Sequence, residues 1–179
     1  MKKSILGFAL SLPLLASMSL TAQAADGQIE FTGSISGTTC TINGGAGGQN
    51  FTVAMAPAHV SQLAAAGHVA ERQPFNIQLT NCTPGTGNVD ISFLNGPSVD
   101  LWAGRLNVDA GGAQNVQIQL LNANALPIRI GAPTGSQNTI PVPLVAGAAT
   151  LNYYSEYYAT GVATPGAANT RVQYLVNLP

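Results

Sequence analysis

Short segments in which apolar and polar residues alternate recur along the chain, and they constrain the fold more than any other feature. The clearest of them are residues 75–80, 89–93 and 116–120. Alternation with a period of two is typical of a β-strand that buries one face. Clusters of Gly, Pro and Asn separate the segments, as expected for turns, and only residues 59–66 favour a short helix. This pattern predicts a single all-β domain built as an antiparallel sandwich.

The first 24 residues have the pattern of a secretory signal peptide. Lys2 and Lys3 precede an almost wholly apolar run, residues 5–20, and small residues at 22–24 offer a cleavage site. A membrane-spanning helix is the alternative, but it would need about 20 apolar residues without such a processing site. We therefore expect an exported mature chain that begins at Ala25 and keeps 155 of the 179 residues.

Charged residues make up only 7% of the chain. After removal of the signal peptide, four arginines oppose seven acidic residues, which gives a formal charge of −3. No basic patch for nucleic acid is expected from so few cations. A surface rich in Asn, Gln, Thr, Ser and Gly suits a protein that packs against copies of itself.

The chain has two cysteines, Cys40 and Cys82. In an exported protein, two cysteines most simply form one disulfide. A structural metal site would need further ligands, and no histidine lies near either thiol in the sequence. A redox motif is not indicated either, because the C-x-x-C spacing is absent.

Catalytic signals are missing from the sequence. His59 and His68 lie in an alanine-rich segment with no nucleophile or carboxylate at a known motif spacing, so we expect surface or capping roles for them. No hydrolase, zinc-protease or nucleotide-binding motif occurs. We therefore expect no enzyme activity, no catalytic or metal-binding residues and no cofactor. Trp102 is predicted to be a packed aromatic, with stacking on a glycan as the alternative.

The two ends of the mature chain carry apolar faces that lack an obvious neighbour. Near the N-terminus, Gly27, Ile29 and Phe31 fall on one side of an extended chain. Near the C-terminus, residues 172–178 alternate again, and the outer edge of such a strand needs a partner. The simplest alternative for residues 27–36 is the first strand of their own domain, which is also our interpretation for residues 35–42.

Several motifs, taken in order, resemble one family over essentially the whole mature chain. They are Phe31-Thr-Gly33, Cys40-Thr-Ile42, Pro74-Phe-Asn-Ile-Gln-Leu-Thr-Asn-Cys82, Tyr157-Tyr-Ala-Thr-Gly161 and Pro165-Gly166, followed by the alternating terminus. The chain in this respect resembles type 1-like fimbrial subunits of the chaperone-usher class, of the major shaft type. Leu178 is a difference, because that family usually has a tyrosine at the penultimate position.

The resemblance implies an incomplete immunoglobulin-like β-sandwich that lacks its last strand, with an N-terminal extension that acts as a donor strand. On this basis residues 1–24 are the signal peptide, residues 25–36 are the extension leading into the first strand, and residues 37–179 are the pilin domain. The implied donor residues are Ala25, Gly27, Ile29 and Phe31. The residues implied to form the acceptor groove or to contact the chaperone are Gly166, Val172, Tyr174, Val176 and Leu178.

The same resemblance implies the partners and the destination of the chain. Its partners would be identical or related pilin subunits in a head-to-tail polymer, a periplasmic chaperone and an outer-membrane usher, with no nucleic acid. The chain would pass through the periplasm to a fimbria on the cell surface and support cell adhesion. A minor adaptor or a glycan-binding pilus subunit is the alternative function.

Overall fold

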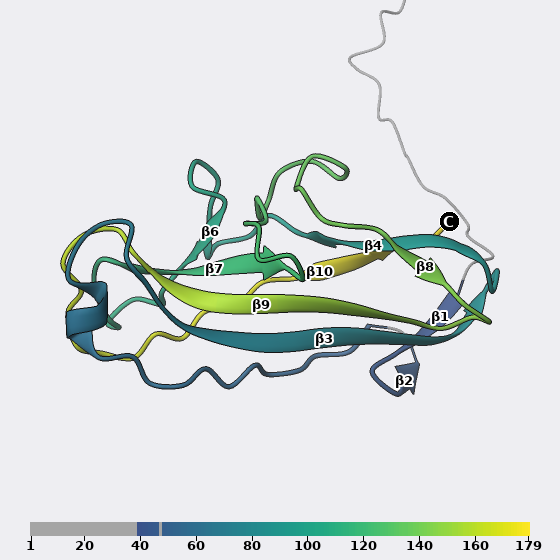
Figure 1. The fold of residues 1–179 in the computed structure, drawn as a ribbon, viewed down its shortest axis with the longest axis horizontal. Coiled ribbons are helices and arrows are strands. Elements are labelled where there is room, and N and C mark those ends of the chain that lie inside the picture. The colour runs from purple at the N-terminus through teal and green to yellow at the C-terminus, as the bar shows by residue number, and fades with distance from the viewer. Residues whose placement is uncertain (1–38, 47) are drawn as a thin grey trace, which may run out of the picture. The chain divides into compact units, whose positions relative to one another are not determined.

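The described part of the protein, residues 39–46 and 48–179 of a computed structural model, consists of β-strands and one short 3-10 helix (Figure 1). The predicted signal peptide, residues 1–24, and the predicted extension, residues 25–36 with its donor residues, lie outside the described residues. The strands in the first half are β1 (Thr39–Ile42), β2 (Gly45–Ala46), β3 (Val69–Thr83), β4 (Gly87–Phe93), β5 (Val99–Asp100) and β6 (Arg105–Asn107). The second half contains β7 (Val116–Asn122), β8 (Val142–Leu144), β9 (Ala149–Ala159) and β10 (Tyr174–Asn177).

The strands form two antiparallel sheets. The larger sheet has the order β2-β1-β3-β9-β7-β6-β5, and the smaller has the order β10-β4-β8. The long strands β3 and β9 lie side by side through the middle of the larger sheet, with Phe75 opposite Tyr153 and Ile77 opposite Leu151 (Figure 1). In the smaller sheet, β10 pairs only with β4 among the described residues. The expected all-β sandwich is confirmed, and β10 is an edge strand in it.

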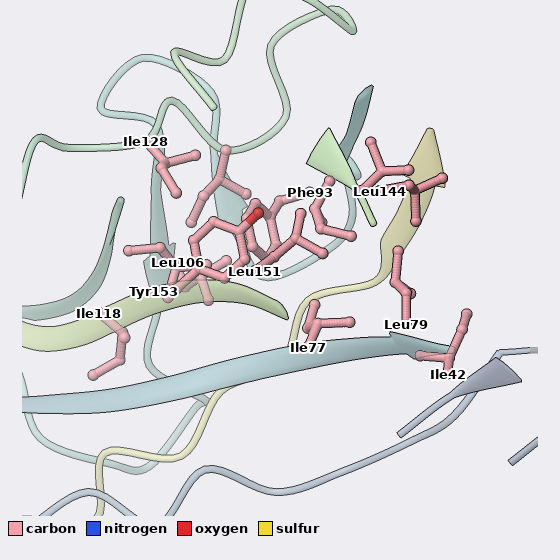
Figure 2. Packing of buried hydrophobic residues seen from close by; sticks show 14 of the residues in the cluster. Ile42, Ile77, Leu79, Phe93, Leu106, Ile118, Ile128, Leu144, Leu151 and Tyr153 are labelled. Carbon is pink, nitrogen blue, oxygen red and sulfur yellow. The ribbon is translucent and has the colours of Figure 1, made fainter. Parts of the chain in front are cut away.

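The core lies between the two sheets and follows the alternation of the sequence. Ile77 and Leu79 of β3 and Leu151 and Tyr153 of β9 are buried from one side, and Phe93 of β4 is buried from the other (Figure 2). Phe93 and Tyr153 meet edge to face with ring centroids 5.5 Å apart. Burying aliphatic side chains of this size stabilises a fold by roughly 1.5–3 kcal/mol each, so these alternating segments supply much of the driving force.

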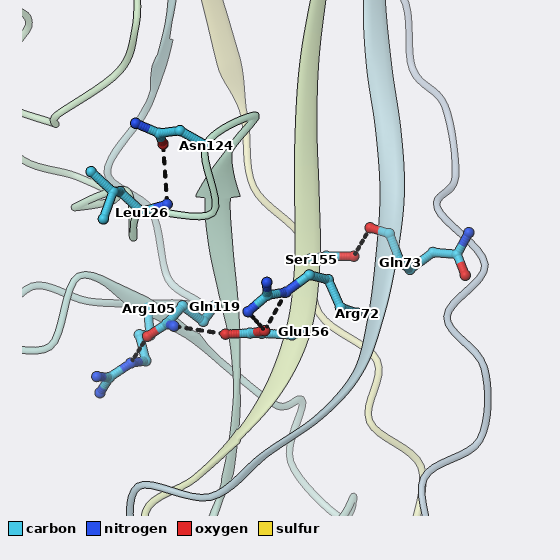
Figure 3. Close-up of polar contacts among 8 residues, drawn as sticks. All are labelled: Arg72, Gln73, Arg105, Gln119, Asn124, Leu126, Ser155 and Glu156. Atoms are coloured by element: carbon cyan, nitrogen blue, oxygen red, sulfur yellow. Dashed lines mark hydrogen bonds and ion pairs between the residues drawn. The ribbon is translucent and has the colours of Figure 1, made fainter.

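The outer face of the larger sheet carries a chain of hydrogen bonds around one buried carboxylate. Glu156, only 3% exposed, pairs with the Arg72 guanidinium at 2.8 Å and accepts a hydrogen bond from Gln119 (Figure 3). Arg105 in turn donates to Gln119 and stacks 3.5 Å above the ring of Tyr158. A buried charge requires such partners, because an unpaired carboxylate loses its hydration without compensation.

The disulfide predicted between Cys40 and Cys82 is present, and it joins β1 to β3. Cys82 is buried against the core, whereas Cys40 is partly exposed. Because β1 has only four residues, this covalent link fastens a short strand to the long strand beside it.

Two local expectations from the sequence need correction. The predicted helix over residues 59–66 is a single 3-10 turn, Val60–Leu63, which His59 caps through its ring nitrogen Nδ1. Trp102 was expected to pack and instead is 99% exposed, at the turn between β5 and β6. That turn is held by Asp100, whose carboxylate accepts from the backbone N–H groups of Ala103 and Trp102. The Ala103 bond, a bond from the Gln117 side chain and the Trp102 bond lower the pKa of Asp100. None of the helices in the described part is long and apolar enough to cross a membrane.

Candidate functional site

A groove of about 1050 Å³ opens beside the segment that leads into β10. One wall is the extended segment 48–55, and the other wall is the segment 168–174. The floor consists mainly of buried core side chains, so the groove lies directly over the hydrophobic core. The floor residues are Phe75, Ile77, Phe93, Leu94, Leu106, Ile118, Leu120, Ser155 and Tyr157.

The floor of the groove is mainly apolar. Ile77, Leu106 and Ile118 are at most 3% exposed although they border the groove. Tyr157 also lines the groove, and burial raises the pKa of its hydroxyl, with the nearby charge of Glu71 adding to the effect. A surface of this kind favours apolar side chains over ions, because transfer of a charge into it costs hydration.

The C-terminal wall is held in place by hydrogen bonds to neighbouring segments. The Asn169 carbonyl accepts a hydrogen bond from the Asp109 N–H, and the Gln173 carbonyl accepts one from the Leu94 N–H, both at 2.8 Å. The Thr170 hydroxyl also donates to the Asn107 carbonyl at 2.7 Å. The segment is therefore extended and fixed before it continues into β10.

The opposite wall carries apolar side chains at alternate positions, Phe51, Val53 and Met55. Phe51 is 41% exposed, and its ring lies 6.0 Å from that of Tyr174 on the other wall. The Tyr174 hydroxyl also donates to the Gln49 carbonyl at 2.7 Å. The two walls therefore meet at this point, and elsewhere the groove between them is open.

A smaller cavity of about 290 Å³ shares Met55, Tyr157 and Ala168 with the groove, so it extends the same depression. Gly166 lies in its lining. A Cβ atom on Gly166 would stand 2.6 Å from the backbone nitrogen of Ala113, which is closer than real Cβ atoms approach other atoms. Glycine is needed here because two backbone segments come together.

The structure distributes the predicted acceptor residues over three places. Val172 and Tyr174 line the groove, and Gly166 lines the smaller cavity. Val176 and Leu178 are partly buried against the core and are not among the lining residues of either depression. The wall 48–55 was not predicted, although Phe51, Val53 and Met55 show the same alternation as the strands. The functional role of all these residues stays a prediction.

The remaining chemistry of the described residues is sparse. His59 and His68 are both exposed, as expected of surface or capping histidines. In residues 39–46 and 48–179, no three His, Cys, Asp or Glu side chains are grouped closely enough to hold a metal ion. The groove is therefore the feature that any functional assignment must explain.

Comparison with known proteins assigns the chain to a family. Residues 29–178 match the profile that describes the fimbrial protein family. The chain belongs to the fimbrial protein family. This fimbrial protein is 44% identical to the major fimbrial subunit SMF-1 of Stenotrophomonas maltophilia, over 91% of its own length and 98% of the relative. It is 33% identical to a type-1 fimbrial protein, A chain, of Escherichia coli strain K12, over 93% of each.

Solved structures agree with this assignment at the level of the fold. A structure of a chaperone-usher pilus matches with a TM-score of 0.59 and 19% identity, covering 89% of this fimbrial protein and 99% of the matched chain. The resemblance to type 1-like fimbrial subunits is thereby confirmed, and the family is one of structural subunits, not a family of enzymes.

Proposed function

We propose that this fimbrial protein is a shaft subunit whose groove is filled by the N-terminal extension of the next copy. The observation that carries the proposal is the largely apolar groove beside the segment that leads into β10, an edge strand that pairs only with β4 among the described residues. An extended peptide can add to such an edge through main-chain hydrogen bonds while its alternate side chains enter pockets. Residues 25–32 have the matching pattern, with Gly27, Ile29 and Phe31 on one side.

The energetics favour a durable polymer. Burial of Ile29 and Phe31 in the groove would contribute roughly 1.5–3 kcal/mol each. Each ladder hydrogen bond along the strand would add roughly 0.5–1.5 kcal/mol. Since each copy has one donor and one acceptor, the contact is heterologous and does not close, and a filament results.

The route to the surface follows from the family. Subunits of chaperone-usher pili cross the periplasm bound to a chaperone, which covers the groove. The subunit joins the growing fimbria at the usher in the outer membrane. Gly166, Val172, Tyr174, Val176 and Leu178 are the residues that we assign to the acceptor side. The name of the SMF-1 relative, a major fimbrial subunit, supports the shaft role over a minor adaptor.

The first test is electrophoresis of protein sheared from the cell surface, with and without boiling in SDS. The full chain is compared with a variant whose mature form lacks residues 25–32. We expect a ladder of polymers from the full chain that survives SDS unheated and collapses to monomer on boiling. The deletion should abolish the ladder. Monomer in every lane of the full chain would mean that residues 25–32 belong to their own domain.

Substitutions sharpen the assignment of the donor face. Changing Ile29→Asp and Phe31→Asp places two charges on the face that we assign to the groove, so chaperone binding should persist while fibres fail to extend. The matched control is Gln28→Asp with Thr32→Asp, which puts the same charges on the opposite face and should leave extension intact. Fibres of normal length from the first variant would refute the donor assignment.

A further inference from the structure

Arg171 is the single charged residue among the described residues that line the groove. Its guanidinium is bound to the Asp109 carboxylate at 2.8 Å, and its side chain is 77% exposed while that of Asp109 is 40% exposed. Arg171 lies one residue before Val172, on the C-terminal wall. The guanidinium thus stands at the mouth of the groove and not in its apolar floor.

The segment that we assign to the groove has the opposite charge. Residues 25–36 contain Asp26 and Glu30 and no basic residue. Side chains alternate along an extended chain, so when Gly27, Ile29 and Phe31 face the floor, both acids face outward. Outward-facing side chains of a strand in the groove pass the rim, which is where Arg171 is exposed.

No other described cation is in a position to meet these acids. Arg72 pairs with Glu156, and Arg105 is engaged by Gln119 and Tyr158 on the outer face of the larger sheet. Arg129 is exposed but is not a lining residue of the groove. The polar side chains of the opposite wall, among them Asn50 and Thr52, are uncharged.

We propose that Arg171 is a specificity-determining residue that attracts an acidic donor strand, and that Asp109 moderates this attraction. The inference rests on the proposed function, because it names the charge of the strand that the groove prefers. Arginine presents five N–H donors, and the one ion pair with Asp109 leaves others free for an approaching carboxylate. Asp109 repels the same carboxylate, so the two residues act with opposite sign.

The effect belongs mainly to the rate of association. Exposed charge pairs change affinity little, but complementary charges speed the encounter of two partners and the gain falls as salt rises. At low ionic strength we expect loss of the Arg171 charge to change the association rate by about two- to fivefold. At 0.5 M salt the Debye length is well below 10 Å, and the effect should largely disappear.

The experiment measures how fast a labelled peptide of residues 25–36 enters the groove of the full chain held in its chaperone complex. The variants are Arg171→Gln and Asp109→Asn, with Arg129→Gln as a control for loss of a cation outside the groove. A second peptide carries Asp26→Asn and Glu30→Gln. Rates are recorded at 20 mM and 500 mM NaCl by fluorescence anisotropy and native electrophoresis.

We expect Arg171→Gln to slow the acidic peptide two- to fivefold at 20 mM NaCl, Asp109→Asn to accelerate it, and Arg129→Gln to leave it unchanged. The neutral peptide should enter all four proteins at similar rates. If Arg171→Gln slows both peptides equally, or neither, the inference is overturned while the groove keeps its proposed role. If no peptide enters the unmodified chain, the proposed function itself fails, and the inference fails with it.

Discussion

Removal of the disulfide should cost this fimbrial protein about 4 kcal/mol of its free energy of unfolding. Cys40 and Cys82 are 42 residues apart in sequence. The chain-entropy relation for a loop of that length gives about 4 kcal/mol at 25 °C. We choose Cys40→Ala with Cys82→Ala, because alanine leaves no hydroxyl at the buried Cys82 position.

Strand β1 is the part of the fold that should lose stability first when the disulfide is removed. The disulfide fastens β1, whose remaining hold on β3 is a short ladder with a register shift between Thr39 and Thr41. Without the covalent link, β1 should fray before the long pair of β3 and β9 opens. Hydrogen exchange should therefore rise at Ile42 before it rises at Ile77.

The assay is equilibrium urea unfolding of the unmodified and doubly substituted chains in the same oligomeric state, since binding alters apparent stability. In a thermal melt of the same chains, about 4 kcal/mol corresponds, for a domain of this size, to a fall in Tm of roughly 8–16 °C. Reduction of the unmodified chain should give the same loss, and the reductant should leave the alanine variant unchanged. A loss below about 1 kcal/mol, or one that the reductant deepens in the alanine variant, would refute the reasoning.

Two further predictions concern single positions. Gly166→Ala should destabilise the chain by about 1–3 kcal/mol, because the added Cβ would meet the Ala113 backbone, whereas Gly96→Ala, with nothing within 4 Å, should be close to neutral in the same thermal melt. Tyr153→Phe should keep or raise stability at pH 7, since the buried Tyr153 hydroxyl has no hydrogen-bond partner. Burial, and secondarily the charge of Asp90, raises the pKa of Tyr153 above its ordinary value of 10. As the pH rises, the tyrosine therefore ionises in the unfolded state before it ionises in the folded state. The free energy of unfolding should then fall above pH 10, by up to about 1.4 kcal/mol per pH unit. Urea unfolding between pH 8 and pH 11 should show a weaker decline in the phenylalanine variant, and an identical decline would contradict this account.

Alternation predicted the strands well where one face is buried and one is not. Residues 75–80, 89–93 and 116–120 all lie within β3, β4 and β7. The bounds were harder to predict, because β3 continues through Pro74 and through a register shift between Ala70 and Gln73 that no periodic pattern encodes. At the C-terminus, β10 begins at Tyr174, two residues later than the alternation suggests.

The misjudged positions have physical causes too. Trp102 is a large aromatic residue of the kind that usually packs in a core, but it lies at the turn between β5 and β6 and is 99% exposed. The wall 48–55 alternates like a strand without pairing as one among the described residues, so its place opposite the C-terminal wall becomes visible only in the contact of Phe51 with Tyr174. A groove between two segments so far apart in sequence follows from the topology and not from either segment alone.

The C-terminal wall of the groove has a consequence for the kinetics of assembly. Hydrogen bonds from Asp109, Ala113 and Leu94 already hold residues 167–173 in place with the groove open. Ordering a backbone costs roughly 1–2 kcal/mol per residue, and for this wall that cost is met when the subunit folds. An arriving strand needs to order only itself, and one occupant could be displaced by another step by step. The subunit thus keeps this wall of the groove preformed when one strand leaves and before the next one binds.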